Sequence, residues 1–116
     1  MQTLLDKIWN VHVVDCPSAR LAQLYIDRLY CHEVTTPQAF KQLHARGIPF
    51  FRPDRAICMA DHDVPTALHP AATDEVLQRQ IQLLADHAAA CGLTYFPPGD
   101  PHHGIIHVVG PESGLT

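Results

Sequence analysis

Asp61, His62 and Asp63 form the densest group of side chains in the sequence that could perform acid–base chemistry. They directly follow an apolar run, and a carboxylate beside an imidazole can orient the ring, set its tautomer and raise its basicity. Adjacent residues of an extended chain point to opposite sides, so their adjacency alone does not establish contact. The sequence therefore offers two interpretations, a catalytic pair at the end of a strand or a solvated turn.

A second group contains three imidazoles within the segment 101–107. On the final strand that we expect over 105–109, His103 and His107 would share one face. A mononuclear metal site could combine His103 or His107 with His62 and Asp61, a nitrogen and oxygen donor set that suits zinc or non-haem iron. The alternative is a histidine-rich loop without a metal.

The composition narrows the class of protein. The 116 residues are enough for one domain, expected over 1–116, and the formal net charge of −4 argues against binding to nucleic acid. No apolar run is long enough for a membrane span, and the opening residues do not resemble a signal peptide, so we expect a cytoplasmic protein. The four cysteines are widely separated, which predicts reduced thiols and neither a disulfide framework nor a cysteine-ligated metal: Cys16, Cys31, Cys58 and Cys91.

Helices and short strands alternate along most of the chain, which predicts an α/β domain. The expected helices begin after Thr3, at Thr36–Pro37 with a stop at Gly47, and at the N-cap Thr73 with an end at Cys91 and Gly92. The expected strands lie at 11–14, within 21–34, at 55–60, at 93–96 and at 105–109. Polar residues at the end of a buried strand, as in 61–63, are where α/β proteins place their sites.

Four segments in this order resemble the start of the large subunit of 3-isopropylmalate dehydratase, a family within the aconitase superfamily of iron–sulfur hydro-lyases. The resemblance extends from Leu4 to Thr116 and rests on Leu24–Arg28, His32–Phe40, Met59–Val64 and Gly104–Gly114. It implies a single small α/β domain like the N-terminal portion of aconitase domain 1, with short strands and flanking helices.

The resemblance also implies roles for individual residues. Asp61 and His62 match an active-site Asp-His pair, in which the histidine helps to protonate or orient a departing hydroxyl. His107 matches a histidine that lines the family's active site, and His32 matches a substrate-contacting position. Because the family pattern continues into a D-S-H motif and three cluster-binding cysteines that this sequence lacks, we expect no iron–sulfur ligands and no cluster on this chain alone.

Three functions follow as hypotheses. The first is a partial or derived hydro-lyase acting on a small hydroxy- or unsaturated carboxylic acid, completed by a cluster-bearing partner chain. The second is a stand-alone homo-oligomer in which Asp61, His62, His107 and either His103 or His32 bind a mononuclear metal or act as acid and base. The third is a non-catalytic binding or interaction module. For the first hypothesis, the expected apolar interface residues are Ile48, Phe50, Phe51, Ile105 and Ile106.

Overall fold

Three short parallel strands form a sheet at the centre of the protein. The structure, a computed structural model, describes residues 1–64 and 74–112. The strands β3 (Leu29–Cys31), β4 (Ala56–Met59) and β5 (Thr94–Phe96) lie side by side in that order. The chain is an α/β protein, as the sequence predicts, and the sheet brings the carboxyl ends of all three strands to one edge.

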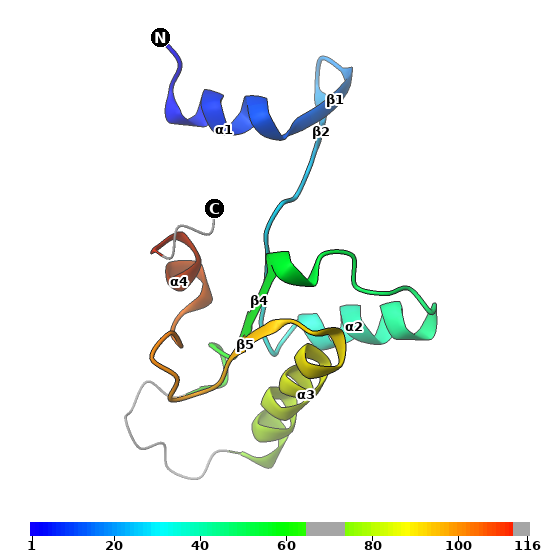
Figure 1. The fold of residues 1–116 in the computed structure, drawn as a ribbon, viewed down its shortest axis with the longest axis vertical. Helices are drawn as coiled ribbons and strands as arrows, with labels where there is room; N and C mark the ends of the chain where they lie inside the picture. Colours follow the sequence, from blue (N-terminus) through cyan, green and yellow to red (C-terminus); the bar gives the residue numbers. More distant parts are fainter. Residues whose placement is uncertain (65–73, 113–116) are drawn as a thin grey trace.

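Helices cover both sides of this sheet. The helix α2 (Thr36–Ala45) connects β3 to β4, and α3 (Glu75–Cys91) precedes β5. Because parallel crossovers are right-handed and the strands follow in sequential order, successive crossover helices lie on the same face of a sheet. Figure 1 shows α2 and α3 together on one side of the strands and α4 (Ile106–Glu112) on the other. A single 3₁₀ turn, η1 (Pro53–Arg55), leads into β4.

The ends of α3 follow ordinary capping chemistry. Its N-cap is Asp74, whose carboxylate accepts a 2.8 Å hydrogen bond from the backbone N–H of Val76. The expected N-cap Thr73 lies outside the described residues. The helix ends where Gly92 adopts the left-handed conformation (φ 67°), which a residue without Cβ reaches at no steric cost, and Leu93 then donates to the Ala88 carbonyl.

The main core lies between the sheet and these two helices. It includes fully buried side chains from the middle of β4 and from the inner face of α3, of which Cys58, Leu84 and Ala88 are completely inaccessible. Phe40 of α2 closes the cluster, and its ring stacks on His87 at 5.1 Å between ring centroids. The elements that hold the strand ends in place are therefore packed as a conventional apolar interior.

The N-terminal arm, residues 1–24, lies apart from this core (Figure 1). It consists of α1 (Leu4–His12) and an antiparallel hairpin of β1 (Val13–Ser18) with β2 (Leu21–Leu24). No residue of α1 is buried, and its apolar side chains are all exposed. The radius of gyration is 16.9 Å, compared with about 13 Å for a compact domain of this length, which reflects the detached arm.

Three predictions of secondary structure are wrong. Residues 11 and 12 of the strand expected over 11–14 complete α1, and β1 instead covers Val13–Ser18. The final strand over 105–109 is instead the start of α4, although its β-branched residues favour a strand. Tertiary contacts override that preference, since Asp61 accepts a hydrogen bond from the Ile106 N–H at the start of this helix, and Gly110 packs so closely on Tyr30 that a Cβ would lie 2.6 Å from its ring. The expected strand within 21–34 is two strands, β2 and β3, in different sheets.

The apolar surface also differs from expectation. Phe51, Ile48 and Ile105 are exposed as predicted, but Ile106, the first residue of α4, is buried and Phe50 packs against the core. The exposed apolar side chains of the N-terminal arm were not predicted from the sequence. In the described part of the chain, no helix has the length and apolar character needed to cross a membrane.

Truncation of Leu84 tests the core assignment. Leu84 is fully buried whereas its neighbour Leu83 is 43% exposed, so Leu84→Ala removes packed methyl groups that Leu83→Ala does not. We expect Leu84→Ala to lower the free energy of unfolding by about 2–5 kcal/mol and Leu83→Ala to have a clearly smaller effect, measured by urea denaturation. Equal losses in the two variants would contradict the described orientation of α3.

Candidate active site

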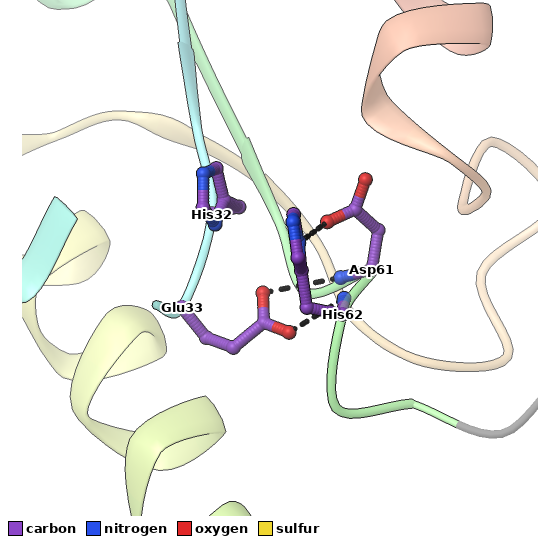
Figure 2. A group of neighbouring side chains, drawn as sticks. All are labelled: His32, Glu33, Asp61 and His62. Atoms are coloured by element: carbon purple, nitrogen blue, oxygen red, sulfur yellow. Dashed lines mark hydrogen bonds and ion pairs between the residues drawn. The ribbon is translucent and has the colours of Figure 1, made fainter. Parts of the chain in front are cut away.

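The candidate site lies at the carboxyl ends of β3 and β4. Because Cys31 pairs with Cys58 in the parallel register, the residues that follow these two cysteines leave the sheet side by side. Figure 2 shows the result, in which His32 and Glu33 after β3 face Asp61 and His62 after β4.

Glu33 is the buried anchor of this group, with only 1% of its surface exposed. Its carboxylate accepts hydrogen bonds from three consecutive backbone N–H groups, at 3.1 Å from Asp61, 2.7 Å from His62 and 2.6 Å from Asp63. Such charge-assisted bonds are the stronger class of protein hydrogen bond and compensate the cost of burying a carboxylate. They fix the backbone that carries the Asp-His pair.

Asp61 and His62 are in direct contact, which their adjacency in the sequence alone does not establish. The Oδ1 atom of Asp61 lies 2.5 Å from Nδ1 of His62. Since an ionised carboxylate is only an acceptor, Nδ1 carries the proton of the neutral ring. Nε2 then carries a free lone pair. The Asp61 side chain is 4% exposed and the His62 side chain 47%, so a buried carboxylate orients a ring that solvent or a ligand can reach.

His32 completes one wall of the site. Its ring stacks on the His62 ring, with 4.3 Å between ring centroids and 19° between the planes. A 2.9 Å hydrogen bond from its backbone N–H to the Thr36 hydroxyl ties the end of β3 to the first turn of α2. The Thr35 hydroxyl lies 3.2 Å from His32 Nε2, so the ring has a partner on its own segment.

The segment 100–106 is fastened to the same strand end by two contacts. The second oxygen of Asp61, Oδ2, accepts a 2.9 Å hydrogen bond from the backbone N–H of Ile106. Nε2 of His103 lies 2.6 Å from the carbonyl oxygen of Ala60, to which it donates. Earlier in the segment, the backbone N–H of His102 holds the pKa of the Asp100 carboxyl below its usual value.

The structure therefore brings together most but not all of the predicted site residues. His62 contacts both Asp61 and His32, and His103 contacts the residue before Asp61. His107 lies on α4, one residue beyond the hydrogen bond to Asp61, with an exposed side chain. Glu33 was not predicted as a site residue, although the parallel pairing of two buried strands could have indicated that the residues following both strands meet.

One group of donor atoms in the described residues is close enough to suggest a metal site. The atoms come from His32, Glu33, Asp61 and His62 and lie within 4.8 Å of one another, and the group includes neither His103 nor His107. Most of these atoms already have partners, because Glu33 accepts three N–H groups and Asp61 holds His62 Nδ1. The stacked rings also present their lone pairs in nearly parallel planes, so both cannot point at one ion without rotating.

The cysteines do not fit an iron–sulfur cluster at this site. Cys31 and Cys58 are buried in the core, and Cys91 packs against the same core, so these three thiols lie away from the exposed face of His62. Cys16 is on the N-terminal arm, and the candidate donor group contains no cysteine.

Comparison with known families assigns nearly the whole chain to one family. The model of the aconitase family (aconitate hydratase) matches residues 6–116, which is nearly the whole chain. The chain belongs to the aconitase family. No solved structure matches this aconitase-family chain.

Curated relatives place the chain more closely within the family. The 3-isopropylmalate dehydratase large subunit of Bacteroides fragilis is 54% identical over 117 residues, and the matched region is 100% of this chain and 25% of that protein. The proteins of the same name from Phocaeicola vulgatus and Bacteroides thetaiotaomicron are 54% and 50% identical, over 98% and 100% of this chain. The aconitase-family chain thus spans about a quarter of the length of the curated relatives it matches.

The tautomer of His62 tests the Asp-His contact. We expect the neutral His62 ring to be protonated at Nδ1, which ring ¹⁵N shifts report directly. In Asp61→Asn the single amide oxygen cannot serve both the Ile106 N–H and the ring, so the population of the Nδ1–H form should fall. The exposed His44 is the internal control and should keep its ring shifts in both proteins.

Proposed function

We propose that this chain provides the acid–base part of an aconitase-type hydro-lyase that acts on a small hydroxy- or unsaturated carboxylic acid. The observation that carries the proposal is the buried Asp61 carboxylate bonded to Nδ1 of a half-exposed His62 at the edge of a parallel sheet. This pairing matches the role in which an imidazole takes up and delivers a proton at one fixed atom.

The chemistry follows from the atoms of the pair. Nε2 of His62 gains a proton while Asp61 stabilises the resulting imidazolium through Nδ1–H. The protonated Nε2 then donates to the hydroxyl of a bound hydroxy acid, the carbon–oxygen bond breaks with its electron pair on oxygen, and the hydroxyl leaves as water. A base on the remaining polypeptide takes the proton from the adjacent carbon, and the electron pair of that carbon–hydrogen bond forms the carbon–carbon double bond of the unsaturated acid. In the hydration direction, neutral Nε2 accepts a proton from the entering water.

Two further histidines lie where they could take part in binding such an acid. His32 stacks on His62, so a ligand that reaches Nε2 of His62 also meets the His32 ring, and we propose that His32 contacts the substrate. His107 lies just beyond the N–H group that Asp61 fixes, and we propose that it faces the remaining part of the active site. The names of the curated relatives suggest 3-isopropylmalate as the first acid to test.

We propose that the remainder of the active site comes from further polypeptide. This chain spans a quarter of its relatives, which are named as large subunits, and the candidate donor group contains no cysteine. We propose that a cluster-bearing segment, either a separate chain or a continuation of this one, supplies the electrophile that polarises the substrate. The exposed apolar arm is consistent with packing against such a segment.

A second candidate function is mononuclear metal binding by a homo-oligomer. The specific observation in its favour is the group of donor atoms from His32, Glu33, Asp61 and His62 within 4.8 Å. Binding through these residues would require Nε2 of His62 as a ligand and rotation of the stacked His32 ring. The third possibility is a non-catalytic module. In that case, replacement of His62 or His32 would have no effect on activity.

Replacement of His62 tests the catalytic proposal. The tagged chain is isolated anaerobically from its own cells, native mass spectrometry identifies partner chains, and the assembly is assayed for dehydration of 3-isopropylmalate. We expect a larger cluster-bearing polypeptide in the assembly, and a loss of about 10²–10⁴-fold in kcat for His62→Ala because the proton donor is absent. His44→Ala, at an exposed position of α2, is the matched control and should retain activity. Full activity of His62→Ala would contradict the proposal.

Metal content separates the two candidate functions. After incubation with zinc and dialysis, we expect the chain to retain much less than one equivalent, because the donor atoms are already hydrogen-bonded. Elemental analysis by plasma mass spectrometry measures this directly. One equivalent of zinc that is lost in His62→Ala but kept in His44→Ala would instead support the metal-binding function.

A further inference from the structure

We infer that Glu33 is the positioning residue for the Asp-His pair, an inference that rests on the proposed function for its catalytic meaning. No role was assigned to Glu33 by the residue pattern or the family resemblance. Its carboxylate is buried and accepts hydrogen bonds from the backbone N–H groups of three successive residues.

The backbone at 61–63 is not extended. In an extended strand, successive N–H groups point to alternate sides, so a single carboxylate cannot accept from three in a row. Here Oε2 of Glu33 accepts from Asp61, and Oε1 accepts from His62 and Asp63. The three N–H groups converge, and the backbone bends directly after β4. Concave arrangements of successive N–H groups are anion-binding sites in proteins, and here the anion is the protein's own side chain.

This bend also determines how the side chains of Asp61 and His62 are directed. Adjacent side chains of an extended segment point apart, but those of Asp61 and His62 meet at 2.5 Å. The bend that Glu33 stabilises is therefore a condition for the Asp-His contact. Because Asp61 also binds the Ile106 N–H, the same bend decides where the segment leading into α4 is attached.

The number of N–H donors explains why residue 33 is a carboxylate and not an amide. Two oxygens with about four acceptor sites can satisfy three donors, whereas a glutamine offers one oxygen and a donor group. In Glu33→Gln the amide oxygen can keep the bonds to His62 and Asp63, but the NH₂ group would then face the N–H of Asp61. A glutamine thus preserves the volume of the side chain and two of its hydrogen bonds, and an alanine preserves neither.

The inference is tested on the full chain by the ring ¹⁵N shifts of His62, which do not depend on catalysis. We expect the ratio of the Nδ1–H to the Nε2–H form to decrease from the native protein to Glu33→Gln and further to Glu33→Ala, by about fivefold for each hydrogen bond lost. Glu75→Gln removes the same charge from an exposed position at the start of α3 and should leave the ratio unchanged. An unchanged His62 tautomer in a folded Glu33→Gln would overturn the inference, since a merely space-filling role predicts that result.

A measurement on the native chain covers the case in which Glu33→Gln does not fold. Scalar couplings across hydrogen bonds should connect the amide nitrogens of His62 and Asp63 with the carboxyl carbon of Glu33, because those bonds are the shortest of the three. Absence of both couplings would overturn the inference. If the couplings and the tautomer change are found but His62→Ala keeps full activity in the assembled enzyme, the proposed function fails and the positioning role of Glu33 remains.

Discussion

The parallel pairing of β3 with β4 is the constraint on which the site depends. The register that places Cys31 opposite Cys58 requires the residues after each strand to leave the sheet at the same level. Glu33 then reaches the N–H groups beyond β4, and His32 lies against His62. A shift of one residue would turn Glu33 toward the other face of the sheet and leave the backbone after β4 without its buried acceptor.

Asp61 distributes its two oxygens between two tasks. Oδ1 orients the His62 ring, and Oδ2 holds the Ile106 N–H where the chain enters α4. Because the side chain is almost inaccessible, neither oxygen is left to water, and the position of α4 is linked to the position of the ring. Asp61 therefore both orients the His62 ring and attaches the start of α4. The residue pattern alone could not show that one side chain does both.

Local signals in the sequence predicted a large part of the fold, and non-local contacts decided the remainder. Thr3, Pro37 and Gly92 lie at or beside helix ends where short-range capping chemistry puts them. The β-branched residues before Gly110 favoured a strand, but hydrogen bonding to Asp61 and close packing on Tyr30 place them in a helix. In the site, the residues near His62 were found through type and resemblance, whereas Glu33 could be found only from the strand pairing. The contact between Asp61 and His62 depends on a backbone bend that no periodicity encodes.

The hydrogen bonds that build the site also have a consequence for folding. Glu33 bonds to residues 28 to 30 positions further along the chain, His103 bonds across 43 positions and Ile106 across 45. Such distant contacts carry the largest loop-closure cost and are characteristic of slow folding. The helices and the hairpin can form from neighbouring residues, but the Asp-His pair is assembled only when three separate parts of the chain have met. Its formation therefore marks the completion of the domain rather than an early stage of its folding.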